Sequence, residues 1–164
     1  MGVKIMSKLT EEVDLLRSIP MFAGMPANKL KLLAFASDHI TVADGDMLFN
    51  QGDDADAAYI VIEGAADVLV ASEAGAEPSR VAQLGRNSVI GDMAILADIP
   101  RTASVRAEGE LEILKISRDH MMDMVKDSPT LALAVLKELV ERLARTTHDL
   151  SEAKSELAGL KKAS

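Results

Sequence analysis

The chain has 164 residues, a length that predicts one domain with room for an appended element. Apolar residues make up 48% of it but aromatic residues only 2%, so we expect a core of aliphatic side chains and methionine. The absence of cysteine excludes a disulfide framework and any cysteine-held zinc or iron–sulfur site, and a formal charge of −8 argues against binding to nucleic acid.

The same acidic charge disfavours an anionic membrane surface as a partner. No apolar run approaches the length of a transmembrane helix, and the N-terminus lacks the apolar centre of a signal peptide. We therefore expect a soluble, cytoplasmic protein with no membrane partner. The three histidines, His39, His120 and His148, share no metal-ligand spacing, so no metal site is expected.

The N-terminal part of the chain predicts helices. Apolar residues recur at helical spacing over residues 11–17 and 27–36, and residues 1–10 are expected to form an N-terminal tail. Between the two helices lies a turn-rich connector, in which Met21 and Phe22 are expected to be buried anchors.

From about His39 the apolar period changes to two, which is typical of an antiparallel sandwich or barrel. Glycines are expected between strands, where a tight turn or positive φ is easy for glycine alone, and Asn87 suits a left-handed position. The polar segment 72–79 is expected to be a hairpin loop. The glycines in question are Gly45, Gly52, Gly64 and Gly85. The expected strands are 38–43, 47–50, 58–63, 65–71, 79–84, 88–90, 102–107 and 111–117.

The C-terminal part of the chain predicts helices again. Ser117 can cap a helix over residues 118–126, and Ser128 followed by Pro129 is typical of a helix start. The final helix is expected to run towards Leu160. The sequence thus divides into a domain over residues 11–127 and a long C-terminal helical segment over residues 128–164.

One stretch, residues 91–104, carries the expected chemistry. It begins with Gly91 and Asp92, continues as a short apolar run of good helix formers, and ends at Pro100 and Arg101. A helix N-terminus and a nearby arginine can together hold one anionic group. Asp92 would not sit on the anion itself, so we expect it to accept a hydrogen bond from a hydroxyl of the same ligand.

This stretch resembles the phosphate-binding cassette of cyclic nucleotide-binding domains. Residues 90–96 read I-G-D-M-A-I-L and residues 100–104 read P-R-T-A-S, and residues 48–53 and 59–64 match the family's strand and glycine pattern. The resemblance implies a mainly β fold, a double-stranded β-helix (jelly-roll) barrel with N-terminal helices and a long C-terminal helix.

The resemblance also implies roles for individual residues. Arg101 would bind the exocyclic oxygens of a cyclic phosphate, helped by the N–H groups of Ala94 and Ala103 and the hydroxyl of Thr102. Asp92 would stand where the family has a glutamate that binds the ribose 2′-hydroxyl, one methylene shorter than the glutamate. In addition, Ile90 replaces an aromatic residue of the family pattern. Gly91 and Met93 complete the cassette part of the expected site.

Leucines recur every seven residues along the final helix, with a second row three residues after each, which makes a coiled-coil a/d seam. Charges of opposite sign at the flanking positions favour a parallel homodimer. The alternative is a single helix packed on its own barrel, which would leave the distal leucines exposed. The first row is Leu136, Leu143, Leu150 and Leu157, and the second is Leu139, Thr146, Ala153 and Leu160.

The seam holds two adjacent hydroxyl residues, Thr146 and Thr147. The surrounding run resembles the dimerisation helix of the catabolite activator family, which implies that Thr146 reads the adenine amino group in its own protomer and Thr147 in the partner. A polar residue that tunes helix register is the alternative. Thr102 complicates the choice of purine, because the cassette ending also resembles that of cyclic-nucleotide-gated channels. Cyclic AMP is favoured over cyclic GMP as the ligand.

We therefore expect a dimeric regulatory module, not an enzyme, that binds a cyclic nucleotide and signals to an unidentified effector protein. Ligand would close the cassette against the barrel and the final helix. No helix-turn-helix segment is visible, so a stand-alone sensor without a DNA-binding domain is expected. The alternative function is a ligand-independent dimeric scaffold with a degenerate nucleotide pocket, which the shorter Asp92 keeps open.

Overall fold

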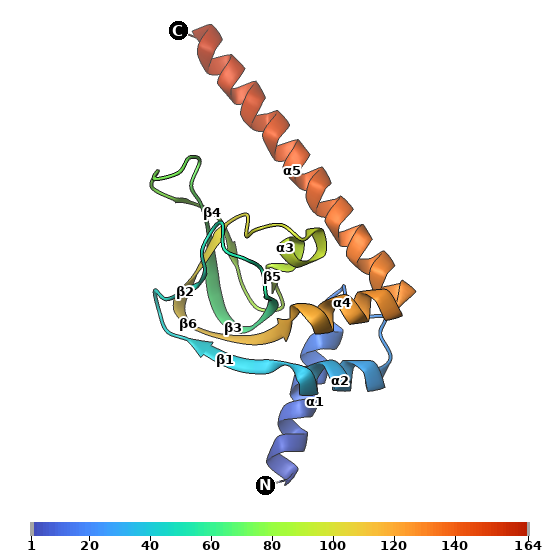
Figure 1. The fold of residues 1–164 in the computed structure, drawn as a ribbon. Helices are drawn as coiled ribbons and strands as arrows, with labels where there is room; N and C mark the ends of the chain where they lie inside the picture. The colour runs from blue at the N-terminus through green and yellow to red at the C-terminus, as the bar shows by residue number, and fades with distance from the viewer. Residues whose placement is uncertain (1, 164) are drawn as a thin grey trace.

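The computed structural model describes residues 2–163, with side chains described from Lys8 onward. It consists of a strongly curved antiparallel sheet with helices at both ends of the chain (Figure 1). The prediction of a mainly β fold with flanking helices is thus confirmed. In chain order the elements are α1 (Gly2–Ser18), α2 (Ala27–Ala36), β1 (Asp38–Val42), β2 (Met47–Phe49), β3 (Ala57–Val70), β4 (Ser79–Leu84), β5 (Val89–Ile90), α3 (Asp92–Ala97), β6 (Ser104–Ser117), α4 (Arg118–Asp127) and α5 (Pro129–Ala163).

Two long strands, β3 and β6, form the centre of the sheet. The main strand order is β1-β6-β3-β4, and β2 also pairs with β6 while β5 also pairs with β3. All pairings are antiparallel, as the period-two pattern predicted. The short strands therefore attach to different parts of the same two long strands, which lets the sheet curl around an interior.

The prediction of separate strands on either side of Gly64 is wrong. Residues 57–70 form one strand, and so do residues 104–117, where two strands were also expected. Gly64 has φ +94°, and a Cβ there would lie 2.5 Å from the carbonyl oxygen of Glu110 on β6. The pairing register also shifts on both sides of Glu63. Gly64 therefore bends a continuous strand against its neighbour instead of ending it.

The long strands are apolar on both faces, because each separates two hydrophobic clusters. In β3, Ala57, Tyr59 and Val61 face the cluster inside the barrel, whereas Ala58 and Ile60 face the cluster beneath the helices. The helical cluster also contains Met21 and Phe22, which are buried as the sequence predicted. The core is accordingly aliphatic and methionine-rich.

The N-terminal helix is longer than expected. The helix predicted over residues 11–17 begins at Gly2, so residues 2–10 of the expected tail belong to α1, while α2 matches the predicted range 27–36. Asn87 has φ +69°, in agreement with the left-handed position assigned to it.

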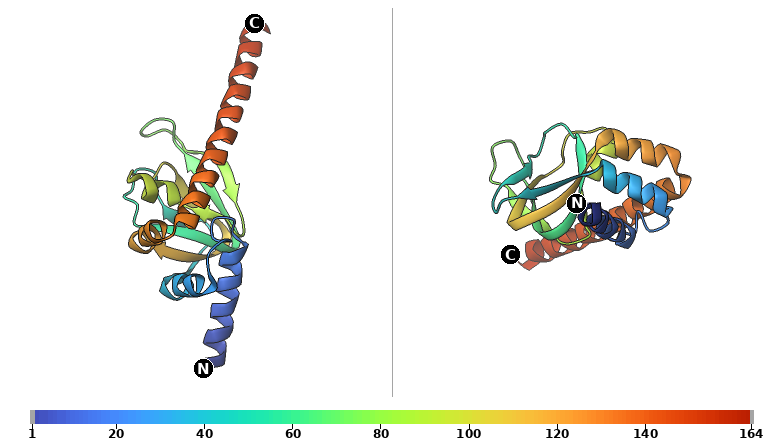
Figure 2. Two further views of the ribbon diagram at one scale, coloured as in Figure 1. Left: turned by 90° about the vertical axis from the view of Figure 1, so that its right-hand side faces the viewer. Right: turned by 90° about the horizontal axis from the view of Figure 1, so that it is seen from below.

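The two C-terminal helices begin at the predicted caps. The hydroxyl of Ser117 accepts a hydrogen bond from the His120 N–H, and that of Ser128 accepts one from the Leu131 N–H. Only the first part of α5 packs on the rest of the molecule, through the buried Leu131 and Val135. The remainder projects past the barrel (Figures 1 and 2).

Across residues 2–163, no helix combines the length and the apolar character that a membrane crossing requires.

Candidate functional site

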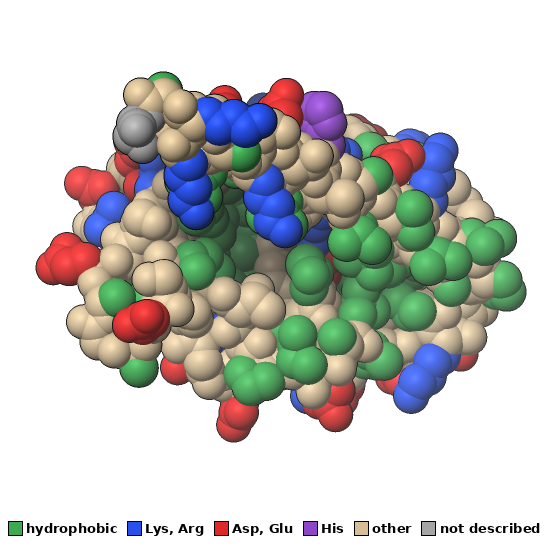
Figure 3. All heavy atoms as spheres, turned by 90° about the horizontal axis from the view of Figure 1, so that it is seen from above, with side chains coloured by type: hydrophobic (Ala, Val, Ile, Leu, Met, Phe, Trp, Pro, Cys, Tyr) green, Lys and Arg blue, Asp and Glu red, His purple; other side chains and the backbone are tan. Residues whose placement is uncertain are grey.

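A cavity of about 390 Å³ lies between the barrel interior, α3 and the first half of α5. Its size falls in the range of small-molecule sites. From above, the surface is hollowed at this place and basic side chains overhang the hollow (Figure 3). Arg142 and Arg145 of α5 are the basic residues that line the cavity from the helix side, and Arg101 lines it from the barrel side.

Arg101 is held at the barrel end of the cavity and is only 3% exposed. Its Nη1 donates to the Gly91 carbonyl at 2.8 Å and its Nη2 to the Ala57 carbonyl at 2.6 Å. The loop before β3 fixes its main chain, since the Arg101 N–H donates to the Asp53 carbonyl and the Gly52 N–H donates to the Arg101 carbonyl. The Nε of Arg101 is buried and has no partner.

Aromatic rings support the guanidinium from one side. The Phe49 ring lies 4.0 Å from the Arg101 Cζ and the Tyr59 ring lies 5.9 Å from it, both within cation–π range. Burial lowers the pKa of Arg101 from its ordinary value, although the neighbouring Tyr59 and Asp56 oppose that shift. Arg101 forms one ion pair, a long one of 3.9 Å to Asp56, whose carboxylate is largely exposed to solvent and therefore compensates the buried cation only weakly.

Gly91 allows this close approach. It has φ +80°, and a Cβ on it would collide with the Nη1 of Arg101 and lie 3.4 Å from the Phe49 ring. Only glycine therefore lets the carbonyl of residue 91 and the guanidinium of Arg101 meet at this point. Gly91 also precedes α3 directly, so the same residue sets the start of the cassette helix.

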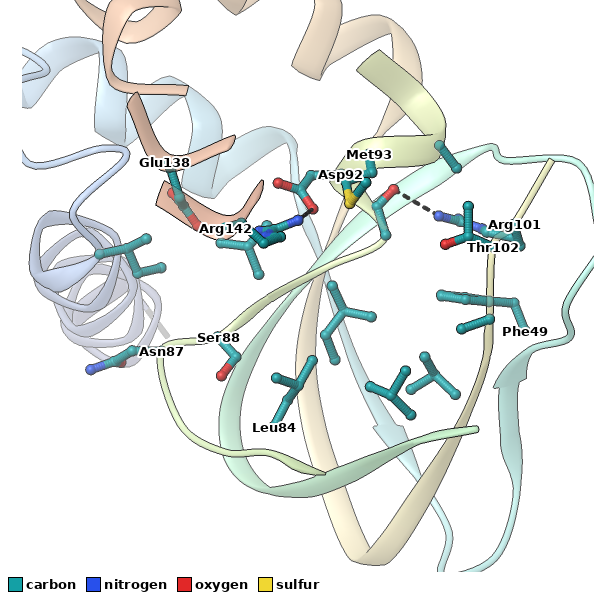
Figure 4. Close-up of a pocket in the computed structure, with 18 of the residues that line it drawn as sticks. Phe49, Leu84, Asn87, Ser88, Asp92, Met93, Arg101, Thr102, Glu138 and Arg142 are labelled. Atoms are coloured by element: carbon teal, nitrogen blue, oxygen red, sulfur yellow. Dashed lines mark hydrogen bonds and ion pairs between the residues drawn. The ribbon is translucent and has the colours of Figure 1, made fainter. Parts of the chain in front are cut away.

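Asp92 lines the same cavity as Arg101, and its carboxylate points away from Arg101 towards Arg142 of α5 (Figure 4). It is 2% exposed, and its Oδ1 lies 3.4 Å from Nη1 of Arg142. Arg142 also reaches Glu138 on its own helix, at 3.3 Å. The second carboxylate oxygen of Asp92 is buried without a partner. A buried acceptor of this kind is costly unless something donates to it.

The pKa of Glu138 depends on burial and on the charged residues around it. Burial raises the pKa of Glu138 above its ordinary value, and the nearby Asp92 raises it further, whereas Arg142 and Arg145 lower it. The Asp92–Arg142–Glu138 group therefore contains two carboxylates for one shared arginine in a partly desolvated place.

The structure gathers the cassette residues of the predicted site around one cavity: Gly91, Asp92, Met93, Ala94, Arg101, Thr102 and Ala103. Thr146 and Thr147 lie further along α5, exposed to solvent and outside the lining of the cavity. The Thr146 hydroxyl donates to the Arg142 carbonyl within the helix.

Sequence reasoning missed the α5 residues that line the cavity. Leu131 and Val135 are buried on α5, and Glu138, Arg142 and Arg145 continue the same alternating spacing of three and four residues. Extending the buried stripe of α5 past its last apolar residue would have placed these charges over the barrel. Phe49 was also missed, because nothing local in the sequence shows which ring an arginine stacks on.

The part of the chain that the structure describes contains no group of three or more His, Cys, Asp or Glu residues able to hold a metal ion.

Comparison with known proteins identifies the family of this chain. The model of the cyclic nucleotide-binding domain family matches residues 39–128. The cAMP-dependent protein kinase regulatory subunit of Blastocladiella emersonii is 31% identical over 103 residues, which are 63% of this chain and 25% of that protein.

Two solved structures are similar in fold. The catabolite activator protein of Thermus thermophilus superposes with a TM-score of 0.72 and 25% identity, covering 80% of this chain and 62% of that one. The regulatory domain of Toxoplasma gondii PKA, in a co-crystal with cAMP, superposes with a TM-score of 0.74 and 24% identity, covering 83% and 51%. The chain spans about a quarter of the length of the kinase regulatory subunits that it matches.

Proposed function

This chain belongs to the cyclic nucleotide-binding domain family, and on that premise we propose that it is a regulatory module that binds cyclic AMP in preference to cyclic GMP. One observation carries the proposal. A buried guanidinium with an unpartnered Nε and a buried carboxylate with an unpartnered oxygen face the same cavity of about 390 Å³. A ligand with one anionic group and one neighbouring hydroxyl satisfies both.

Arg101 receives the cyclic phosphate. Two of its five N–H donors are used by the Gly91 and Ala57 carbonyls, which fix the plane of the guanidinium and leave the others for the anion. The Thr102 hydroxyl and the N–H groups of Ala94 and Ala103 complete the cradle. Charge-assisted hydrogen bonds inside a desolvated pocket are stronger than those in water.

The carboxylate oxygen of Asp92 that has no partner accepts a hydrogen bond from the ribose hydroxyl, while its other oxygen stays near Arg142. This contact links the ligand to α5, because Arg142 belongs to that helix. Closure of the cassette and α5 over the nucleotide is the proposed signal. A ligand shifts such an equilibrium only by its differential affinity for the open and closed states, and the Asp92–Arg142 pair is where that difference can arise.

The base lies towards α5, where Thr146 of one protomer and Thr147 of its partner contact the adenine amino group. This part of the proposal requires the homodimer expected from the leucine seam. It is supported by the exposure of that seam: Leu143, Leu150, Leu157 and Leu160 are all more than half exposed in the single chain. An unidentified effector protein would read the closed state. The proposed role is binding and regulation, not catalysis.

Isothermal titration calorimetry of the full chain with cyclic AMP, cyclic GMP and adenosine tests the proposal. We expect cyclic AMP to bind most tightly, cyclic GMP more weakly and adenosine weakest, because adenosine lacks the anion for Arg101. Tighter binding of cyclic GMP would reverse the base preference. Equal binding of adenosine and cyclic AMP would refute the role of Arg101.

The second candidate function is a ligand-independent dimeric scaffold. The observation that favours it is the ion pair between Arg142 and Asp92, which already engages one oxygen of the proposed ribose ligand. Under this alternative, no nucleotide produces heat or thermal stabilisation, yet the chain remains dimeric.

A further inference from the structure

A second cavity, of about 380 Å³, lies between α2 and α4, away from the nucleotide pocket. The two helices run side by side in Figure 1 and again in the right-hand view of Figure 2, where the molecule is seen from below. The cavity shares no lining residue with the nucleotide pocket. We call it the α2–α4 groove. Its lining residues are Met25, Lys29, Leu32, Leu33, Phe35, Ala36, His120, Asp123, Met124 and Asp127.

The groove has an apolar floor and an exposed apolar wall. Met25 and Leu33 form the buried part, while Leu32 is 69% exposed and Phe35 is 82% exposed on the α2 side. Phe35 is notable because the whole chain contains only three phenylalanines and one tyrosine. An aromatic ring and methionines along an open groove are typical of surfaces that receive an apolar helix face.

The opposite wall, on α4, is acidic. Asp123 and Asp127 are one helical turn apart on α4, and both are exposed. Like charges at this spacing destabilise a helix, and a carboxylate in the last turn also opposes the helix dipole. Among the described residues, no Lys, Arg or His lies within ion-pairing distance of either carboxylate. Neither charge has an ion-pair partner among the described residues, although Lys126 lies in the same last turn of α4 and Lys29 lines the α2 wall of the groove.

We propose that the α2–α4 groove is a docking site for an amphipathic helix of a partner protein, with apolar anchors against Leu32 and Phe35 and lysine or arginine on the flank that faces α4. The apolar face of such a helix covers the exposed Phe35 ring and fills the floor above Leu33. Its basic flank neutralises Asp123 and Asp127, the two acidic residues that line the α4 wall of the groove. Because α4 leads directly into α5, the docked helix contacts the element that precedes the roof of the nucleotide pocket.

The test uses two synthetic helical peptides with identical leucine anchors, one with lysines on a single flank and one with glutamates in their place. Binding to the full chain is measured by fluorescence anisotropy without nucleotide, so that the result does not depend on the proposed function. We expect the lysine peptide to bind at least about tenfold more tightly than the glutamate peptide.

Three variants sharpen the assignment. Phe35→Ala should lower the affinity for the lysine peptide by about tenfold or more. Val81→Ala, a matched control at an exposed apolar position on β4, should leave that affinity unchanged. The double variant Asp123→Lys/Asp127→Lys should reverse the peptide preference. Because all these side chains are exposed, the variants should fold, which circular dichroism verifies.

Equal binding of both peptides, or binding that Phe35→Ala leaves unchanged, overturns the proposal. Self-association that Phe35→Ala abolishes, without any preference between the peptides, also overturns it and makes a second copy of the chain the occupant of the groove.

Discussion

The guanidinium of Arg101 is fixed by two backbone carbonyls and an aromatic face, and its ion-pair partner Asp56 lies 3.9 Å away and is largely exposed to solvent. A buried cation left in this condition is costly to the folded chain. An anionic ligand bound to the guanidinium would remove this cost. At the residue scale, the binding proposal therefore depends first on Arg101.

Arg101→Leu should reduce cyclic AMP affinity about tenfold to a hundredfold, because it removes a charge-assisted hydrogen bond worth roughly 1.5–3 kcal/mol. Arg101→Lys is the matched control: it keeps the charge but loses the fork that bonds to two carbonyls at once, so an intermediate affinity is expected. Calorimetric titration measures all three proteins. An affinity of the leucine variant equal to that of the unmodified chain would contradict the assignment.

Phe49 positions Arg101 through the stacking of its ring on the guanidinium at 4.0 Å. Phe49→Leu should lower cyclic AMP affinity by about twofold to tenfold, as expected for the loss of a cation–π contact. Phe49→Tyr keeps the ring face and should bind normally. In an Arg101→Leu background, Phe49→Leu should cause no further loss, and a full additive loss would show that Phe49 acts on the ligand independently of Arg101.

Glu138 provides a pH-dependent prediction. Its pKa in the folded chain is raised above the ordinary value of 4.5 by burial and by Asp92. A raised carboxyl pKa stabilises the fold below the ordinary pKa, and that contribution is lost as pH rises through the higher folded value. Thermal unfolding without nucleotide should therefore show the unmodified chain losing stability relative to Glu138→Gln as the pH rises above the ordinary value of 4.5. A difference in Tm that stays constant as the pH rises would contradict the prediction.

At the scale of single elements, α5 has two faces with different surroundings. One face carries Leu131, Val135, Glu138, Arg142 and Arg145, which pack on the barrel or line the nucleotide pocket. The leucine seam lies on another face and projects into solvent beyond Leu143. The first half of this one helix therefore lines the pocket, and its second half exposes the leucine seam to solvent.

Truncation after Arg145 keeps the pocket-lining face and removes the distal seam. We expect the mass measured by light scattering to fall by about half, from a parallel dimer to a monomer. A full-length chain with Leu150→Ser and Leu157→Ser should behave like the truncation, whereas His148→Ser, an exposed position outside the seam, should remain dimeric. An unaltered mass for the truncation would refute the seam as the interface.

The sequence correctly predicted those features that depend on a few adjacent residues. The caps at Ser117 and Ser128, the left-handed Asn87 and the cassette helix at residues 92–97 were all within reach, because each depends on a few adjacent residues. Gly64 was misassigned, since a glycine that ends a strand and a glycine that bends one look alike until the partner strand is known. The contacts of Asp92 with Arg142 and of Arg101 with Phe49 depend on tertiary packing, which no local pattern encodes.

At the scale of the whole molecule, β3 and β6 unite the two hydrophobic clusters. Leu114 and Ile116 of β6 face the helical cluster, and Leu111 and Ile113 face the barrel cluster. Because β3 and β6 contribute side chains to both clusters, unfolding of these strands would expose both clusters to solvent. The barrel and its helices should therefore unfold together. Both clusters contribute to the lining of the nucleotide pocket, Ala94 from the helical cluster and Ile90 and Val105 from the barrel cluster, so the geometry of the pocket depends on the whole fold.

The bend at Gly64 also decides where this chain could be cut and rejoined. A circularly permuted version that opens within the polar loop 72–78, between β3 and β4, and joins the distant termini through a long flexible linker should fold and melt cooperatively, because that loop is exposed throughout and interrupts neither long strand. Opening the chain at residue 64 should instead give an insoluble product or a lower, broader melting transition. The glycine that the sequence predicts to separate two strands lies inside one continuous strand, so a break at that residue divides the strand that both clusters share.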